Sequence, residues 1–451
     1  MHLTISNIFF SSSQDALIYM DSWFLMISET NNFSQLDVEL FEKIVSRSSL
    51  LVTTEIEVYQ TVDKWINYNF KERIKFAKRL LQKIRLPLLS EKTLKTMLTK
   101  NNCFTINKDS KAIVNDILRS NFDFYRNKQK NFFTARYCSH DAFDILYFGG
   151  YEKTKVDGYV VDDKILRMKH SHDCNNSEKV SSLVKKRYDS KIVYLNGNVY
   201  IFGGFDDRNR FIKEVEMYSH LTKTCKVVAN IEDINNYELC FYAVCGFMDK
   251  IYLFGGYDAL DNERDLCIEF YTEDFSWNHK SNMNEKREDP TACVFEEKII
   301  VSGGIQHPDD DFVNYVNFYD GNFDRRLNTV EAYEPINDTW TEFPTMNYSR
   351  CYHKSVVVKN KLFVLAGGTD INEVYDSTSK KFTVLKPSFS LYDINSNDPI
   401  AAFNVGHKLF SYFEGSSSIF WFDTIKGEWY EEPCEVTKHI DCFSAITAPR
   451  V

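Results

Sequence analysis

The clearest pattern along the chain is a short apolar run that ends in two adjacent glycines. A sixth run of the same kind keeps only one glycine, Gly415. A repeat of roughly 50 residues indicates a solenoid, a propeller or an array, and so it predicts a binding surface rather than a reaction. The five glycine pairs occupy positions 149–150, 203–204, 255–256, 303–304 and 367–368.

A second motif follows each glycine pair and consists of an apolar residue, an acidic residue, any residue and an aromatic residue. An apolar or aromatic residue comes six or seven positions later, which predicts two short strands joined by a tight turn. Another apolar run comes before the run that ends in the glycine pair, and turn residues such as Asn196-Gly197 separate the two runs. Each unit therefore predicts four strands. The second motif occurs at 156–159, 215–218, 268–271 and 330–333, with looser copies at 372–375 and 419–422.

Four strands in each unit describe the blades of a β-propeller, in which glycine pairs let neighbouring backbones approach closely. The glycine pairs and the aromatic residues resemble kelch repeats, and the resemblance spans residues 141–451. The first unit has no clear strand before 144–150, whereas the chain finishes with the strand-like segment 441–451. We therefore expect an all-β six-bladed kelch β-propeller whose first blade is closed by the C-terminal strand, which removes exposed sheet edges.

The first part of the chain shows a helical period instead. Val58, Val62, Trp65 and Ile66 recur at helical spacing after a capping box formed by Thr54 and Glu57, so a helix is expected there. The residues after Ser34 predict another helix. The segment 79–98 predicts a helix that ends near Pro87 and a new helix capped by Ser90.

The segments 33–52, 55–69 and 84–94 resemble the BACK domain, which lies between a BTB domain and kelch repeats in a large adaptor family. The predicted layout is an α-helical BACK-like domain at 1–122, a linker at 123–140 and a kelch β-propeller at 141–451.

In the family that the chain resembles, the BTB domain dimerises the protein and docks a cullin. The sequence starts inside the helical region, and the BTB domain is absent from it. Two alternatives follow: the chain is a fragment or truncated form, or it binds the target of the propeller without delivering the target to a ubiquitin ligase.

Composition agrees with a globular protein that has packed cores, since 43% of the 451 residues are hydrophobic. A net charge of −10 argues against nucleic acid as a partner. The basic segment 71–85 is interpreted as the solvated face of an amphipathic helix. No apolar stretch is long enough for a membrane span and no basic leader begins the chain, so we expect a cytoplasmic protein with access to the nucleus. Eleven cysteines without a Cys-x-x-Cys pair predict reduced thiols, most of them packed in strands.

The chain shows no motif of a hydrolase, nucleotide-binding loop, metalloprotease or dinucleotide-binding fold, and we expect no catalytic activity and no cofactor. His170, His172, Asp173 and Cys174 could offer zinc ligands, but no second ligand pair follows at a zinc-site spacing. A copper oxidase of the galactose oxidase type also contains kelch repeats, yet such enzymes are secreted and differ in blade count.

Length variation among the units is confined to the connection between the glycine pair and the second motif, and variable loops on a rigid scaffold commonly form binding sites. In kelch propellers this connection lies on the face that receives partners. The longest copy, 305–329, combines aromatic anchors with charge and is expected to contact a partner; the alternative is a solvated insertion. The candidate residues in it are Asp310, Phe312, Tyr315, Tyr319 and Arg325.

A second set of candidates lies in the connections between blades. Arg187 and Arg287 both precede their glycine pair by 16 residues, and Arg350 precedes its pair by 17. In kelch adaptors that bind acidic peptides, arginines at this point form bidentate bonds to carboxylates. The alternative is that each arginine pairs with a neighbouring Asp or Glu. The third unit has Glu238 at the matching place, which interrupts a basic surface.

The sequence therefore predicts a protein-interaction adaptor whose propeller binds a target protein or peptide, similar to substrate receptors of cullin-RING ubiquitin ligases. A cullin would bind through the BACK region or through the missing BTB domain. The alternatives are an actin-binding cytoskeletal scaffold and a truncated regulator that sequesters its targets.

Overall fold

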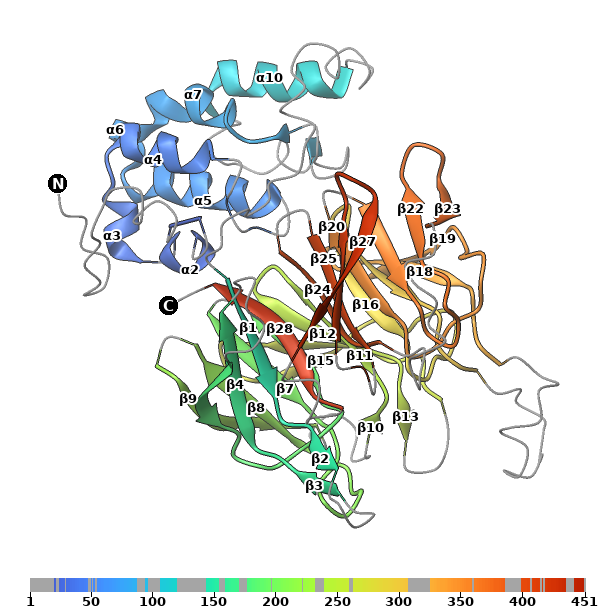
Figure 1. The fold of residues 1–451 in the computed structure, drawn as a ribbon. Helices are drawn as coiled ribbons and strands as arrows, with labels where there is room; N and C mark the ends of the chain where they lie inside the picture. Colours follow the sequence, from blue (N-terminus) through green and yellow to red (C-terminus); the bar gives the residue numbers. More distant parts are fainter. Residues whose placement is uncertain are drawn as a thin grey trace. The chain divides into compact units, whose positions relative to one another are not determined.

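The computed structural model divides the protein into two compact units, Met1–Phe143 and Asp144–Pro449. The first is helical and the second is built of strands (Figure 1). The residues that the structure describes are 20–21, 24–28, 30–47, 50, 52, 55–86, 94–95, 106–119, 143–153, 159–169, 177–195, 197–220, 222–231, 239–258, 263–306, 325–358, 361–385, 399–405, 408–413, 416, 418–434 and 442–449.

The helical unit contains the expected long helix, α5, whose buried face includes Val58, Val62, Trp65 and Ile66. Trp65 stacks on Phe41 at a centroid distance of 4.5 Å, so α4 and α5 share one core. The helices are α2 (Phe24–Ser28), α3 (Asn31–Ser34), α4 (Val38–Val45), α5 (Glu55–Tyr68), α6 (Phe70–Arg73), η1 (Ile74–Phe76), α7 (Ala77–Leu81) and α10 (Lys108–Arg119).

The helix expected after Ser34 is α4, whereas part of the basic segment differs from the sequence prediction. The N-cap of α4 is Asp37, whose carboxylate accepts a hydrogen bond of 2.8 Å from Leu40 N, whereas Ser34 ends α3. Part of the basic segment 71–85 is structural rather than a solvated face, because the guanidinium of Arg73 lies 3.8 Å from the ring of Trp65. Thr54, Pro87 and Ser90 lie outside the described residues.

The second unit is a six-bladed propeller, as the sequence predicts. Each blade is a four-stranded antiparallel sheet, and the C-terminal strand β28 is the innermost strand of blade 1, so the predicted closure is confirmed. From the innermost strand outward, the blades are β28 (Ser444–Pro449), β1 (Phe143–Phe148), β4 (Lys164–Lys169) and β5 (Ser177–Ser182); β6 (Lys191–Leu195), β7 (Asn198–Phe202), β8 (Glu214–Ser219) and β9 (Thr224–Asn230); β11 (Ala243–Phe247), β12 (Lys250–Phe254), β14 (Cys267–Tyr271) and β15 (Trp277–His279); β16 (Thr291–Phe295), β17 (Lys298–Ser302), β18 (Val330–Glu334) and β19 (Thr339–Phe343); β20 (Lys354–Val358), β21 (Lys361–Leu365), β22 (Glu373–Asp376) and β23 (Lys381–Val384); and β24 (Pro399–Val405), β25 (Lys408–Phe413), β26 (Ser418–Asp423) and β27 (Glu428–Pro433).

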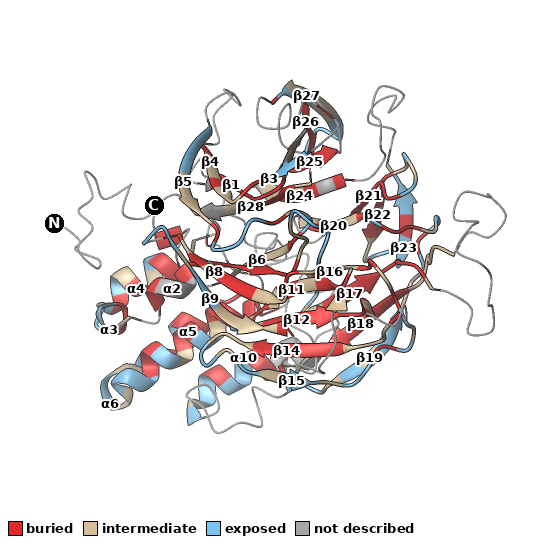
Figure 2. Cartoon of the chain, turned by 90° about the horizontal axis from the view of Figure 1, so that it is seen from below, coloured by how far each residue is buried: buried red, intermediate tan, exposed pale blue. Residues whose placement is uncertain are grey.

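The innermost strands form a closed ring, because each contacts the next from β6 through β11, β16, β20, β24 and β28 back to β6. The second strands are buried along almost their whole length, whereas outer strands such as β19 and β23 are largely exposed (Figure 2). Aromatic residues fill the space between blades. Tyr333 packs on its strand neighbour Trp340 at 4.9 Å, and both contact Phe254 of the preceding blade.

The glycine pairs lie where one blade meets the next. Gly255 has a φ of +66°, and a Cβ placed on it would lie 2.4 Å from the backbone oxygen of Arg287 in the following blade. Gly256 N donates a hydrogen bond of 2.8 Å to the same oxygen. Glycine is therefore required by both the backbone conformation and the close approach of two blades.

Blade 1 corrects one motif assignment. Tyr159, the expected aromatic of the segment 156–159, belongs to β3 (Tyr159–Val161), which pairs only with β2 (Tyr151–Lys153) in a separate hairpin. The third strand of the blade is β4, which carries Met168 opposite Ile145 where the other blades place an aromatic residue. The chain has a hairpin inserted between the second and third strands of this blade.

The described cysteines are free, and three of the six buried ones, Cys245, Cys267 and Cys293, lie in propeller strands within hydrophobic clusters. Burial raises the pKa of the Cys245 thiol to about 12, so this side chain stays protonated and packs as a small apolar group. The interpretation of these cysteines as packed thiols therefore agrees with the structure.

Candidate partner-binding face of the propeller

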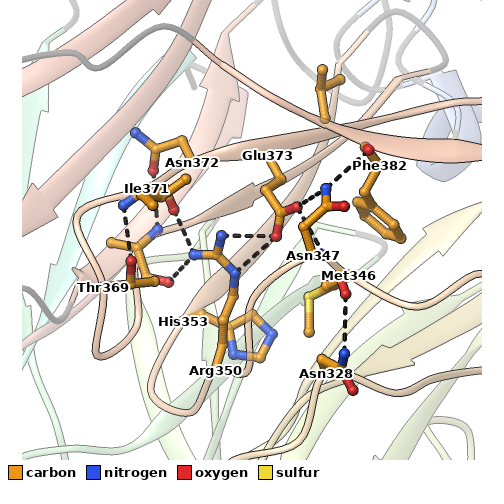
Figure 3. Close-up of polar contacts among 12 residues, drawn as sticks. Asn328, Met346, Asn347, Arg350, His353, Thr369, Ile371, Asn372, Glu373 and Phe382 are labelled. Atoms are coloured by element: carbon orange, nitrogen blue, oxygen red, sulfur yellow. Dashed lines mark hydrogen bonds and ion pairs between the residues drawn. The ribbon is translucent and has the colours of Figure 1, made fainter.

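Three arginines occupy the same place in blades 2, 4 and 5, in the connection that leads to the innermost strand. Arg187, Arg287 and Arg350 are all 0% exposed. The guanidinium of Arg350 donates from Nη1 to the backbone oxygens of Ala366 at 2.5 Å and Ile371 at 2.6 Å in its own blade (Figure 3). Its own backbone oxygen accepts a hydrogen bond of 2.8 Å from the glycine pair of the preceding blade. The other two arginines make the same two kinds of contact, so each links consecutive blades.

The acidic residue of the second motif is the charged partner of each arginine. In blade 5 the carboxylate of Glu373 also accepts a hydrogen bond of 3.0 Å from Asn347 N (Figure 3). Burial lowers the pKa of Arg350, and Glu373 opposes that shift. Hydrogen bonds of this kind are what allow a buried ion pair to offset the free energy of desolvation. The pairs are Arg187 with Glu216, Arg287 with Glu331 at 3.1 Å and Arg350 with Glu373 at 2.9 Å.

This geometry corrects the prediction that Arg187, Arg287 and Arg350 bind a partner. A fully buried guanidinium that already donates to a carboxylate and to backbone oxygens has no free surface for a ligand. Pairing with a neighbouring acid, the alternative that the sequence leaves open, is what the structure shows.

Blade 3 replaces the ion pair with two apolar residues. Counting back four residues from the innermost strand, as for Arg187 before Lys191, leads to Leu239 and not to Glu238, which lies outside the described residues. The strand register also shifts the second motif by one position, because Trp277 pairs with Phe270 rather than with the expected Tyr271.

That shift places Ile268 where Glu216 stands in blade 2. Ile268 is buried in a hydrophobic cluster against which Leu239 packs. Arginine and glutamate are therefore present together in three blades and replaced together in a fourth, which agrees with a structural role for the pair.

Connections between blades and connections between second and third strands meet on one face, which we call the mouth. Short bridges join them there, such as Glu288 to Ile305 and Ile305 to Arg326. Of the predicted site in 305–329, the structure describes Arg325, which is half-buried beside this bridge. Asp310, Phe312, Tyr315 and Tyr319 lie outside the described residues.

Aromatic rings continue across the mouth from blade 1 to blade 3, and we call this set the aromatic surface. The ring of Tyr151 lies 5.5 Å from that of Tyr188, which stacks on Phe205 at the same distance. Phe205 in turn contacts Phe211 at 4.8 Å and Phe241 at 5.8 Å. The sixth member, Tyr159, is 42% exposed, and the others are half-buried. The members are Tyr151, Tyr159, Tyr188, Phe205, Phe211 and Phe241.

Asn209 fixes the edge of the aromatic surface. Its side-chain oxygen accepts hydrogen bonds from the hydroxyls of Tyr188, at 2.7 Å, and of Tyr159. Burial and the neighbouring Tyr159 raise the pKa of Tyr188 to about 12, so the hydroxyl of Tyr188 remains a donor at neutral pH. The amide nitrogen of exposed Asn209 is a donor that a bound backbone oxygen could use.

The sequence analysis missed the aromatic surface, although a signal for it exists. Tyr151, Phe205 and Tyr257 each directly follow a glycine pair, and that position lies on the mouth in every blade where the structure describes a bridge to it. Large amphipathic rings of this kind are the residues that most often dominate binding between proteins.

A depression opens beside the aromatic surface, between blades 2 and 3. Its lining includes Phe205, Phe211, Phe241, Tyr242 and Asp189. Asp189 and Asp289 have the same place in blades 2 and 4, two residues before the innermost strand, and both have a positive φ, of 52° and 51°.

Within the part of the chain that the structure describes, no three His, Cys, Asp or Glu side chains are grouped to hold a metal ion. His170 to Cys174 lie outside it. The described helices also include none that is long and apolar enough to cross a membrane.

Comparison with known proteins agrees with the fold. The model of the KLHDC2/KLHL20/DRC7 Kelch-repeats domain matches residues 136–387, and that of the BACK domain, "BTB And C-terminal Kelch", matches residues 11–99. Kelch repeat and BTB domain-containing protein 12 of Homo sapiens is 21% identical over 369 residues, which cover 77% of this chain and 55% of that protein. Kelch-like protein 7 of Rattus norvegicus is 24% identical over 376 residues, with 82% of this chain and 59% of that protein covered.

A shorter match to Kelch-like protein 28 of Homo sapiens is 33% identical over 104 residues, which cover 23% of this chain and 18% of that protein. The chain thus spans little more than half the length of the relatives that it matches along most of its own length. The matched kelch model covers more than half of the chain, and five of the six blades carry a glycine pair after their second strand. The chain belongs to the family of kelch-repeat proteins, with a BACK domain ahead of its propeller.

Proposed function

We propose that the protein is an interaction adaptor without catalytic activity, whose propeller captures a segment of another protein on its mouth. The observation that carries this proposal is the aromatic surface over blades 1 to 3. Six rings from four connections are held together there, and each ring is half-buried or exposed. Exposed apolar groups gathered in this way on a rigid scaffold are typical of protein-binding sites.

The proposal differs from the sequence prediction in the chemistry of the mouth. Because the three arginines at equivalent blade positions are internal, they supply no basic surface for an acidic peptide. Aromatic rings and the amide of Asn209 favour an extended segment with apolar side chains, whose backbone is hydrogen bonded at one end. The loop 305–329 stays a proposed second contact region, with Arg325 at its described end.

Peptide display on the full chain tests the proposal. Recovered peptides are measured by fluorescence polarisation against the wild type and against a variant with Tyr159→Ser and Phe211→Ser. We expect the variant to weaken binding by about 2 kcal/mol or more, which is roughly a 30-fold loss, because exposed aromatic anchors dominate such interfaces.

The matched control is Ile336→Ser with Ile425→Ser. Both residues are exposed apolar side chains in turns between third and fourth strands, at the opposite end of the strands from the glycine pairs. Equal losses with both double variants would contradict a binding site on the mouth.

Coupling to a ubiquitin ligase is a separate part of the proposal. Kelch repeat and BTB domain-containing protein 12 is named for a BTB domain, and the resemblance noted above implies that such a domain docks a cullin. We propose that this propeller reaches a cullin only when a BTB domain is joined to it. Gel filtration of the present chain with a cullin should then show no complex, whereas a stable complex would place the docking site in the BACK region.

A further inference from the structure

Asp189 and Asp289 offer an internal comparison, because they occupy equivalent positions and share a backbone conformation. The carboxylate of Asp289 lies 3.2 Å from Lys191 Nζ and the residue is 5% exposed. The carboxylate of Asp189 has no hydrogen bond and no ion pair with any described residue. One of two equivalent acids is thus satisfied within the propeller and the other is left for something else.

The charge of Asp189 is only partly balanced by its surroundings. The residue is open to solvent through the mouth, yet protein atoms surround it on nearly all sides, and this burial raises the pKa of its carboxyl group. Two lysines face it. Lys191 is already bound by Asp289, and Lys354 of blade 5 acts on it only at longer range. The carboxylate of Asp189 is exposed to water, so a cationic group of a ligand can reach it without displacing a protein partner.

The depression beside Asp189 has the walls that a cation prefers. Phe205, Phe211 and Phe241 line it, and the faces of aromatic rings attract an ammonium or guanidinium group. Tyr242, which is 2% exposed, also lines it, and its hydroxyl oxygen has no hydrogen-bond partner among the described residues. An acceptor, an acid and three rings therefore converge on one small space, whose lining also includes Lys191, which is held by Asp289.

We propose that a basic side chain of the bound partner, an arginine or a lysine, enters the depression between blades 2 and 3 and pairs with the carboxylate of Asp189. The aliphatic stem lies along the phenylalanine rings, and a remaining N–H donates to the hydroxyl of Tyr242. This inference rests on the proposed function, because the segment that supplies the side chain is the one held by the aromatic surface.

The test uses the peptides recovered by display on the full chain. We expect the recovered peptides to share an arginine or lysine at one position, and replacement of that residue by glutamine to weaken binding about 10-fold to 100-fold, as for a charge-assisted hydrogen bond. The same loss is expected for the original peptide with Asp189→Asn. Asn is tolerated at a positive φ, so the backbone should be preserved. With Asp189→Asn, the glutamine peptide and the original should bind equally.

Two controls separate the possible outcomes. Asp207→Asn removes the same charge from an exposed position on the same face, and it should change affinity by less than about threefold. Without peptide, Asp189→Asn should unfold at the same or a higher urea concentration than the wild type, because it removes an unpaired acid. A loss of stability would show that Asp189 has a structural partner and would overturn the proposal.

The pairing with Asp189 would also be overturned if peptides that need the aromatic surface carry no basic residue, or if Asp189→Asn leaves their affinity unchanged. In either case the proposed function stands. If no recovered peptide depends on the aromatic surface, the proposed function itself fails.

Discussion

The buried pair of Arg350 and Glu373 can be exchanged for apolar residues, because blade 3 already contains that exchange. The perturbation is a double-mutant cycle of Arg350→Leu, Glu373→Ile and the two together, which copies Leu239 and Ile268 into blade 5. Both charged residues are 0% exposed and 2.9 Å apart, so each single change leaves an uncompensated charge in the interior.

The magnitudes follow from these contacts. A buried charge without its partner destabilises a protein by about 3 to 5 kcal/mol, so each single variant should lose at least that much. Replacing the whole ion pair with apolar groups is close to neutral. The double variant still removes the donors to Ala366 O and Ile371 O, and it should therefore lose about 1 to 3 kcal/mol. The coupling energy between the two positions is then at least about 3 kcal/mol.

Urea unfolding followed by tryptophan fluorescence measures the cycle, with the midpoint and the slope fitted for each variant. The double variant should be more stable than either single variant and should still bind the peptides recovered by display. Additive losses would refute the reasoning. Retained stability with lost peptide binding in Arg350→Leu would instead restore the role in partner binding that the sequence suggested.

Three further outcomes are expected. Gly255→Ala should destabilise the propeller by about 1 to 3 kcal/mol more than Gly427→Ala in urea unfolding. Both glycines have a positive φ, but only at Gly255 would the added Cβ lie 2.4 Å from a backbone oxygen, that of Arg287. Equal losses would contradict the close contact between blades. Burial would raise the pKa of Glu269, but hydrogen bonds from Lys250 and three other side chains lower it to about 2. The contribution of Glu269 to stability should therefore be present above about pH 4.3 and decline as pH falls toward 2. Glu269→Gln should flatten that decline. Burial and Asp289 raise the pKa of Glu288 to about 7. The stability that its proton provides should therefore be lost as pH rises from about 4.3 through 7. If the free energy of unfolding of Glu288→Gln changes with pH in parallel with that of the wild type over this range, the assignment is refuted.

The blade count could be predicted because glycine pairs recur where blades meet in five of the six blades. The closure by β28 could be predicted because the first unit lacks a strand before 144–150 and the chain finishes with a strand-like segment. The second motif was less reliable where the chain departs from the repeat. In blade 1 the segment 156–159 satisfies the motif, yet Tyr159 belongs to an inserted hairpin and the true third strand carries Met168. A motif of four residues is too short to distinguish a blade strand from an insertion of similar composition.

The direction of a side chain was harder to infer than its place in the repeat. Arg187, Arg287 and Arg350 lie between blades, as the sequence predicts. A connection at a blade junction has one side toward the mouth and one toward the interior, so this place alone does not decide where the side chain points. The joint loss of arginine and glutamate in blade 3 would have indicated the interior, and the one-residue shift of the motif there concealed it. The aromatic surface is spread over several connections, and only the closed ring brings these rings together.

Closure by β28 has a consequence for how the protein is made. Its neighbour β1 is synthesised at the start of the propeller and β28 at its end, so at ordinary rates of translation blade 1 waits on the order of tens of seconds for its innermost strand. During that time β1 presents an unpaired edge that other chains can join. The ribosome-bound chain is therefore the state in which this protein is most exposed to aggregation, and molecular chaperones that cover strand edges would act on it before the last residues emerge.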